Sequence, residues 1–360
     1  MAALREAQPE GLGDPLRRVQ AALAEELVER HFAEHPELAQ RHGEIGRQRC
    51  LAEANAHLAY LANAMDVRAP ALFTNYVSWA KVMLGKRGIP SADLATCLEL
   101  ARVIVAEKLE GESGATAESY LASAVQLLRS LPTELPTHLP EGAPHVELAR
   151  AYLRALLGGE RHLASQMILD AVTSGVPVRD IYLHVFQPTQ YEVGRRWLLN
   201  EVTIGQEHYC TAATQLIISQ LYPHVFASEK GTGTLVAASV SGDLHELGVR
   251  MVTDFFEMDG WDTYYLGAST PPREVVDTLV TRRADVLAIS VTISFHLVAV
   301  KELIEMVRGR PECAHVKIMV GGYPFIVDPE LWSRLGADGS ALNAQDAIAL
   351  ARRWLGDGTQ

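Results

Sequence analysis

Apolar residues recur at helical spacing through the first third of the chain. One helical face is formed by Leu51, Ala54, Leu58, Leu61 and Met65. The region is rich in Ala and Leu and has few β-branched runs, which favours helices over strands. Pro70 and Pro90 are expected to separate successive helices, with Ser91 as an N-cap candidate. This pattern predicts an all-α domain over residues 1–131.

A proline-rich stretch follows this domain. Four prolines fall between residues 131 and 144, and each removes a backbone donor and restricts the backbone. A regular helix cannot run through such a segment. Residues 132–145 are therefore predicted to form a semi-rigid linker.

Residues 146–228 return to helical spacing. Helices are predicted near residues 146–158, 161–174, 179–199 and 202–222, separated at Gly158-Gly159, Gly175 and Asn200. Four helices with short connections predict a four-helix bundle. Pro188 falls inside the third of them and is expected to kink or split it.

The pattern changes again after residue 229, where short apolar runs alternate with helical segments. Strands are predicted near residues 233–240, 261–266, 285–291, 315–320 and 337–340. Strands separated by helices imply a parallel, doubly wound sheet of the Rossmann-like kind over residues 229–360. The fold class is thus multidomain, all-α followed by α/β.

Composition and charge narrow the function classes. Of the 360 residues, 48% are hydrophobic and 21% charged, as in ordinary globular proteins. A net charge of -12 argues against a broad nucleic-acid surface. No apolar run approaches the length of a membrane span, and no signal-peptide core is present. The four cysteines are scattered without a C-x-x-C pair. We therefore expect a cytoplasmic protein with no nucleic-acid or membrane partner and no cysteine zinc site.

The most informative motif follows the first predicted strand of the sheet. Gly242, Asp243, His245 and Gly248 form a Gly-Asp-x-His-x-x-Gly sequence directly after an apolar run. A carboxylate two residues before an imidazole can hold one ring nitrogen and leave the other free to bind a metal. His245 is therefore the candidate metal ligand.

Small residues end two later predicted strands. Ser290 and Thr292 follow one apolar run, and Gly321-Gly322 ends another. With the Asp-x-His-x-x-Gly motif, they resemble the cobalamin-binding domain that holds the corrinoid with its own base displaced and a protein His on cobalt. The resemblance covers roughly residues 231–356. It implies that His245 is the lower cobalt ligand and that the nucleotide tail enters a slot beside the Ser/Thr and Gly-Gly positions. The alternative is a receiver-like doubly wound domain with an incidental exposed His.

The bundle carries a second pattern, with Trp197 followed after nine residues by Glu207-His208. This resembles the helical cap of light-sensing cobalamin-dependent repressors, in which Trp, Glu and His pack over the upper face and the adenosyl group. Here Leu198 stands where those repressors have a His that captures cobalt after light. No winged helix-turn-helix signature precedes the bundle. Bundles of this kind also occur in methyl-carrying corrinoid proteins.

The order of the predicted domains resembles that of the photocobilins, which pair adenosylcobalamin with biliverdin. It consists of a helical domain with a globin-like number of helices, a linker, a cap and a cobalamin domain. The resemblance implies a bilin site in residues 15–131, with no local motif to mark it. The candidate bilin contacts are Arg47, Arg49, His57, Arg68, Tyr76 and Lys81. Phe73 and Trp79 are candidate pocket-lining residues, and Cys50 is a candidate attachment point. Ordinary surface, core or buried positions are the alternative for each of them.

The resemblance predicts a photoreceptor rather than an enzyme. Light would remove the adenosyl group from cobalt and change the conformation and the oligomeric state of a homo-oligomer, which would signal to an unknown partner protein. The main alternative is a corrinoid methyl carrier of a methyltransferase system. A mutase subunit would need a substrate barrel, which the sequence lacks, and a passive cobalamin binder is a further alternative. No catalytic triad, P-loop or His-Glu-x-x-His motif is present.

Overall fold

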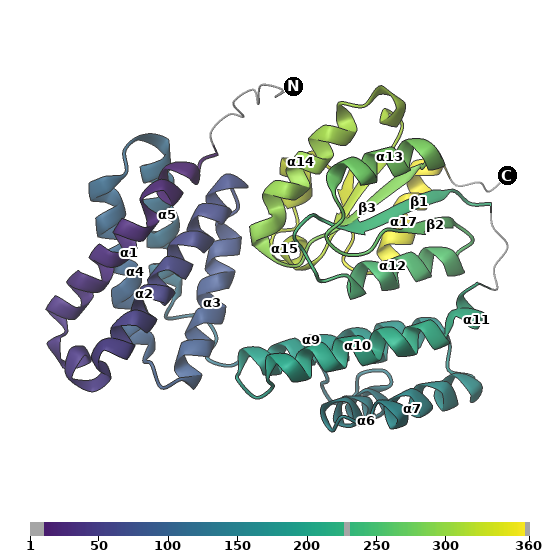
Figure 1. Cartoon of the computed structure of the whole chain (residues 1–360), viewed down its shortest axis with the longest axis horizontal. Helices are drawn as coiled ribbons and strands as arrows, with labels where there is room; N and C mark the ends of the chain where they lie inside the picture. Colours follow the sequence, from purple (N-terminus) through teal and green to yellow (C-terminus); the bar gives the residue numbers. More distant parts are fainter. Residues whose placement is uncertain (1–10, 227–230, 357–360) are drawn as a thin grey trace. The chain divides into compact units, whose positions relative to one another are not determined.

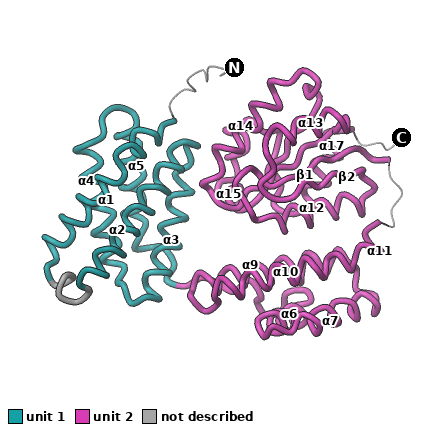
Figure 2. The backbone as a smooth tube through the Cα atoms, in the orientation of Figure 1, with its two compact units in different colours: residues 1–133 teal, residues 134–360 magenta. Residues whose placement is uncertain are grey.

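The computed structural model describes residues 11–226 and 231–356, apart from the side chains of residues 37–42. The chain forms two compact units, residues 1–133 and residues 134–360 (Figure 2). The second unit holds both the helical bundle and the sheet domain. The predicted boundary between those two parts, at residues 228–229, lies outside the described residues.

The described part of the first unit is helical throughout. Its helices are α1 (Asp14–Glu34), α2 (Pro36–Asp66), α3 (Pro70–Lys86), α4 (Ser91–Lys108) and α5 (Gly111–Leu127) (Figure 1). Of the predicted apolar face, Ala54, Leu58, Leu61 and Met65 are buried. Pro70 is the first residue of α3, where its missing N–H costs nothing. Ser91 was wrongly expected as an N-cap: Pro90 occupies that position and Ser91 is already helical.

The second unit begins with the proline-rich segment and the bundle. Residues 131–145 contain neither helix nor strand. The bundle consists of α6 (Val146–Leu157), α7 (Arg161–Thr173), α8 (Val178–Ile181), the π-helical turn η1 (Tyr182–Phe186), α9 (Gln187–Leu198) and α10 (Ile204–Gln220), with the short α11 (Tyr222–Val225) after it. The π-helical turn ends at Phe186, two residues before Pro188. A proline has no N–H to donate and its ring collides with the carbonyl four residues earlier, so the backbone widens there.

The sheet domain is an open parallel sheet with strand order β2-β1-β3-β4-β5. The strands are β1 (Thr234–Ser239), β2 (Asp262–Tyr265), β3 (Val286–Ser290), β4 (Lys317–Gly321) and β5 (Gly339–Ser340). The helices and helical turns between and after them are α12 (Leu247–Met258), α13 (Pro272–Arg282), η2 (Ser294–His296), α14 (Leu297–Arg308), η3 (Pro311–Cys313), α15 (Tyr323–Val327), α16 (Leu331–Leu335) and α17 (Ala344–Leu355). The predicted fold class is confirmed.

Helices cover both faces of this sheet. Helices α12 and α17 pack together on one face, and α13 and α14 pack together on the other (Figure 1). The chain reverses its direction of progress across the sheet between β1 and β3. At such a switch point the loops leave in opposite directions and open a crevice at the carboxyl ends of the strands.

The bundle packs on α12. The Tyr182 hydroxyl donates to the buried Asp254 carboxylate at 2.9 Å, and Arg250 donates to the Tyr222 hydroxyl at 3.0 Å. Helix α12 starts directly behind the loop that follows β1, so these contacts hold the bundle next to the predicted site. Within residues 11–226 and 231–356, no helix combines the length and the hydropathy that a membrane span requires.

Candidate functional site

The loop after β1 is shaped by a glycine with a positive φ. Gly242 has φ 88°, a conformation that side chains rarely adopt. Its N–H donates to the Ser269 hydroxyl at 3.0 Å, and the Ser269 N–H donates to the Asp243 carbonyl at 3.0 Å. The loop is therefore tied to the segment after β2, and Asp243 is turned into the interior.

The buried Asp243 carboxylate organises the loop. One oxygen, Oδ1, accepts from the His245 backbone N–H at 3.0 Å and lies 2.8 Å from its Nδ1. The other, Oδ2, accepts from the Thr292 N–H at 2.6 Å. Burial alone would raise the pKa of Asp243, but the hydrogen bonds from His245 and Thr292 outweigh it and the pKa is lowered. An ionised carboxylate thus joins the loops after β1 and β3.

The His245 ring is oriented by this carboxylate. Its hydrogen bond to Asp243 raises the pKa of the imidazole, against the opposing effect of burial. The side chain is 53% exposed. Because Nδ1 is committed to Asp243, Nε2 is the ring nitrogen that is left to bind a metal.

The strand ends beside this loop carry small residues. Ser239 on β1 pairs with Ser290 on β3, and Ser290 pairs with Gly321 on β4. Gly322 has φ 111°, and a Cβ there would lie 1.9 Å from the Val291 carbonyl oxygen. This close approach requires glycine at position 322. The neighbouring residues Ser239, Ser290 and Gly321 leave this edge of the sheet without bulky side chains.

The residues present fit a cobalamin whose cobalt takes an imidazole from below. The donor is an imidazole with its second nitrogen held by a carboxylate, an arrangement typical of metal-ligating histidines. A Cβ added at Gly248 would meet no protein atom within 4 Å, so packing within the chain does not explain a glycine there. The space next to Gly248, three residues after His245, is therefore open to a bound group.

The three predicted cap residues come from two helices. Trp197 lies in the last turn of α9 and is 43% exposed. Glu207 and His208 lie in the first turns of α10, with Glu207 Oε2 2.5 Å from His208 Nδ1. The charge of Glu207 contributes to raising the pKa of His245, which places the start of α10 near the site. Further along α10, Gln215 donates to Glu246 at 2.9 Å.

Of the six candidate bilin contacts, two hydrogen-bond to each other. His57 Nδ1 lies 2.7 Å from the Tyr76 hydroxyl, and both side chains are buried. Arg68 lies on the surface with Glu112 at 2.9 Å. Arg47 forms an ion pair with Glu29, with 3.8 Å between Nη2 and Oε1. Among the described residues, neither arginine forms an ion pair or hydrogen bond with His57 or Tyr76.

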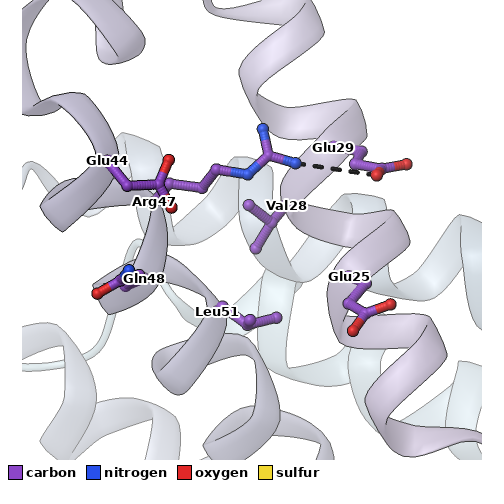
Figure 3. A pocket seen from close by; sticks show the side chains of 7 residues that line it. All are labelled: Glu25, Val28, Glu29, Glu44, Arg47, Gln48 and Leu51. Carbon is purple, nitrogen blue, oxygen red and sulfur yellow. Dashed lines mark ion pairs between the residues drawn. The ribbon is translucent and has the colours of Figure 1, made fainter.

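Arg47 also lines a hollow rich in carboxylates. Glu25, Glu29 and Glu44 surround it (Figure 3). A guanidinium already facing carboxylates is a poor partner for further propionates, because like charges would accumulate. The bilin contacts remain predictions.

The remaining candidates of the first unit differ in burial. Phe73 is buried and its ring lies 6.2 Å from that of Tyr76, and Trp79 lies 5.8 Å from Tyr76. Lys81 is buried and donates to the carbonyls of Leu128 and Leu131. Arg49 is exposed, and Cys50 is partly buried with its thiol free. Lys81 therefore serves to tie down the end of this unit.

Sequence reasoning missed three residues that shape the site. Ser239 donates to the His245 carbonyl at 3.1 Å, Ser269 accepts from Gly242, and Glu246 accepts from both Gln215 and Tyr265. Ser239 was detectable as the small polar end of an apolar strand. Ser269 and Glu246 had no local signal, because these partners lie 19 to 31 residues away in sequence.

Comparison with known families matches two parts of the second unit. Residues 233–350 match the family described as B12 binding domain, and residues 148–222 match a second family of the same description. These matches support a cobalamin-binding protein. The first covers the loop of Asp243 and His245, and the second covers the bundle with Trp197, Glu207 and His208.

Curated relatives are corrinoid proteins. Dimethylamine corrinoid protein 3 of Methanosarcina acetivorans is 30% identical over 129 residues, which is 36% of this chain and 59% of the relative. A corrinoid protein of Desulfitobacterium hafniense is 24% identical over 208 residues, covering 56% of this chain and 95% of the relative. The chain thus spans less than two thirds of the first of these relatives.

A solved structure shares the fold of the second unit. The monomethylamine corrinoid protein of Methanosarcina barkeri superposes with a TM-score of 0.53 at 23% identity, covering 58% of this chain and 99% of that protein. This likeness supports the fold. The photoreceptor, biliverdin and adenosyl predictions find no support in these comparisons, which fit the methyl-carrier alternative better.

Proposed function

We propose that this protein is a corrinoid carrier that holds cobalamin on His245 and presents its upper face to a methyltransferase. The observation that carries the proposal is the Asp243–His245 pair at the switch point of the sheet, with Nδ1 engaged at 2.8 Å. Cobalamin, when bound, supplies a cobalt whose upper position can accept and release a methyl group. The catalytic acids and bases of the transfer then belong to the partner, and this chain is not an enzyme by itself.

The chain's own residues have three roles in this proposal. Asp243 fixes the tautomer and orientation of His245 and raises its basicity. Ser239, Ser290 and Gly321 have small side chains or none, so the edge of the sheet leaves room for a nucleotide tail. The bundle, held on α12, shields the upper side.

The upper side supports exchange with a partner. Trp197 is 43% exposed, and the His208 side chain is also exposed. Side chains that are not packed away can move aside when a partner enters. The resemblance to amine-linked corrinoid proteins favours methyl groups as the cargo.

A second candidate is the light-sensing function, favoured by one observation. Glu207 is held by Thr211, which donates to its Oε1 at 3.2 Å, and by His208. A carboxylate oriented in this way near His245 is suited to accept hydrogen bonds from ribose hydroxyls of an adenosyl group.

The test loads the full-length protein with hydroxocobalamin, methylcobalamin and adenosylcobalamin and records absorption spectra. We expect a spectrum of base-off, His-on cobalamin in the wild type, its loss in His245→Ala, and its retention in the control His208→Ala. After reduction, addition of methyl iodide is expected to methylate the bound corrinoid in the wild type.

Light separates the two candidates. The carrier proposal expects no change in molecular mass, by size-exclusion chromatography with light scattering, when adenosylcobalamin-loaded protein is illuminated. A light-dependent change of mass would contradict it and favour the photoreceptor. A wild-type protein without a His-on spectrum would contradict both.

A further inference from the structure

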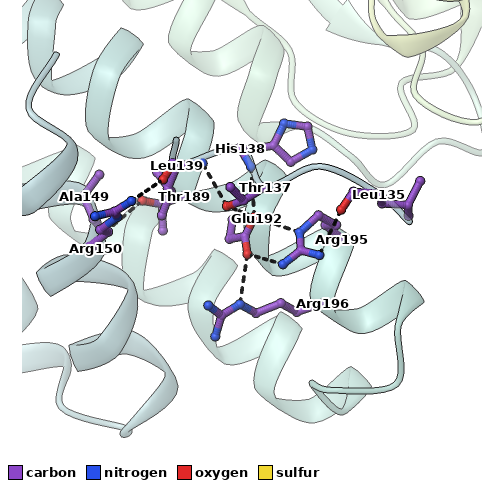
Figure 4. A network of polar contacts seen from close by, with 10 residues as sticks. All are labelled: Leu135, Thr137, His138, Leu139, Ala149, Arg150, Thr189, Glu192, Arg195 and Arg196. Atoms are coloured by element: carbon purple, nitrogen blue, oxygen red, sulfur yellow. Dashed lines mark hydrogen bonds and ion pairs between the residues drawn. The ribbon is translucent and has the colours of Figure 1, made fainter. Parts of the chain in front are cut away.

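Three side chains of the bundle hold the proline-rich segment that follows the first unit. Glu192 of α9 accepts from the Thr137 hydroxyl at 3.0 Å and from the His138 backbone N–H at 3.0 Å (Figure 4). Two further residues bind the segment by its carbonyls: Arg195 donates to Leu135 at 3.3 Å, and Arg150 donates to Leu139 at 3.0 Å. We call this set of contacts the linker clasp.

The Glu192 carboxylate is unusually well satisfied for a residue that touches a connecting segment. Besides the two linker donors, it accepts from Arg195 Nε and Nη2 at 2.9 and 2.7 Å and from Arg196 Nε at 3.0 Å. It is only 1% exposed. Burial would raise its pKa, but these hydrogen bonds lower the pKa to about 2. The carboxylate is therefore ionised at neutral pH, where it is paired with Arg195 and Arg196.

The same carboxylate also fixes the end of α9. Arg195 and Arg196 are the two residues directly before Trp197, and both bond to Glu192 one turn earlier. Bidentate contacts to a guanidinium set its orientation as well as its distance. The last turn of α9 and the linker thus share one anchor.

We propose that Glu192 is a positioning residue that couples Trp197 to the linker. A change in the group that faces Trp197 shifts the last turn of α9 and weakens or strengthens the hydrogen bonds of Glu192 to Thr137 and His138. This proposal rests on the proposed function, because it requires Trp197 to meet the upper side of a bound corrinoid.

Coupling of this kind is reciprocal. If the upper ligand changes the stability of the clasp by some factor, weakening the clasp changes the relative affinity for the two upper ligands by the same factor. A side chain that served only as a structural staple would give no such reciprocity.

The experiment measures hydrogen exchange of the backbone over residues 133–145 in the full-length protein, by mass spectrometry. It compares cobalamin-free protein with protein loaded with hydroxocobalamin or methylcobalamin. Glu192→Gln removes the charge at the shared anchor. Thr137→Val leaves that charge in place and removes the hydroxyl that donates to Glu192 and accepts from the Leu139 N–H. Glu141→Gln is the matched control, since it removes a negative charge from an exposed position in the same segment.

In cobalamin-free protein, Glu192→Gln is expected to speed exchange of this segment at least about tenfold, because it weakens hydrogen bonds to a charged group. Thr137→Val is expected to give a smaller increase, and Glu141→Gln none. In the wild type, exchange is expected to differ at least about fivefold between the two loaded forms, the lower end of ordinary coupling. Trp197→Phe is expected to remove that difference and leave the cobalamin-free rate unchanged.

Two results would overturn the proposal. One is a rate of backbone hydrogen exchange over residues 133–145 that is the same in the wild type loaded with hydroxocobalamin and with methylcobalamin. The other is an unchanged ratio of the two cobalamin affinities in Glu192→Gln, or in Thr137→Val if the first variant does not fold. Either result with a normal His-on spectrum rejects the positioning role alone, whereas absence of that spectrum in the wild type rejects the proposed function.

Discussion

Two histidines of this chain hydrogen-bond through Nδ1 at nearly the same distance, and their pKa values move in opposite directions. His57, in the first unit, lies 2.7 Å from the Tyr76 hydroxyl, and burial lowers its pKa to about 4. His245, at the sheet edge, lies 2.8 Å from Asp243, whose hydrogen bond raises its pKa. The two hydrogen-bond distances are nearly equal. The direction of each pKa shift is therefore decided by the charge of the partner and by the access of the ring to water.

The difference separates a structural histidine from a candidate metal ligand. His57 is 4% exposed and has a neutral partner, so it stays uncharged inside a packed helical core. His245 is half-exposed and has an ionised partner, so its free nitrogen is basic and reachable. The same residue type thus packs a core in one unit and can hold a metal in the other.

The largest expected effect is on His245. His245→Ala removes the donor to cobalt, and the affinity for cobalamin is expected to fall by more than the roughly 10- to 100-fold that loss of an outer partner causes. Titration followed by absorption spectroscopy measures this, with His57→Gln as the control in the other unit. If His57→Gln weakened cobalamin binding as much, the contrast between the two histidines would fail.

The second largest expected effect is a loss of stability of the first unit in acid, caused by protonation of His57. Below pH 6.5 the unfolded chain binds a proton at this residue, but the folded chain does so only near pH 4. The contribution of the neutral folded form is therefore present above pH 6.5 and is lost as pH falls towards 4, by about 3 kcal/mol. Urea unfolding at several pH values, read by hydrogen exchange in α2 and α3, measures it. If the first unit of the His57→Gln variant lost as much stability in acid as that of the wild type, the pH dependence would not come from His57.

A smaller effect is expected when His245 receives a neutral partner like that of His57. Asp243→Asn is expected to lower the pKa of His245, because the Asp243 hydrogen bond is the largest cause of its increase. Cobalamin affinity is expected to fall about 10- to 100-fold. NMR titration of the cobalamin-free protein gives the pKa, and Glu246→Gln is the control. A pKa that stayed raised would mean that other charges control this histidine.

The smallest effect concerns the hydroxyl of Tyr76. Tyr76→Phe removes a buried hydrogen bond to His57 and is expected to cost about 1 to 2 kcal/mol of unfolding free energy. A double-mutant cycle with His57→Gln isolates the contact. Additive losses in that cycle would show that the 2.7 Å contact contributes nothing of its own.

Local patterns in the sequence were sufficient for the elements and for part of the site. The order of helices and strands follows from hydrophobic spacing, and the break before Pro188 follows from the missing N–H of proline. Asp243 and His245 stand two residues apart, so their contact depends on a single short loop. The row of small residues was visible because each ends an apolar strand.

Other features depend on residues that meet only in the folded chain. The Thr292 N–H reaches Asp243 across 49 residues, and Glu192 reaches His138 across 54. The proline-rich segment was predicted as a semi-rigid linker, without a partner, because nothing within it shows that a distant carboxylate would bind it. Arg47 and Arg68 were candidates for ligand contact, and their acidic neighbours became visible only in three dimensions.

The sequence by itself determined which residue types stand at the carboxyl ends of the strands, since strand and loop are set by neighbours in the chain. The tertiary structure decided which of the two histidines is buried beside a neutral hydroxyl and which is half-exposed beside a buried carboxylate. Burial and partner charge come from helices and strands far apart in sequence. For this reason, the chemistry of each histidine is a property of the packed fold and not of its local motif.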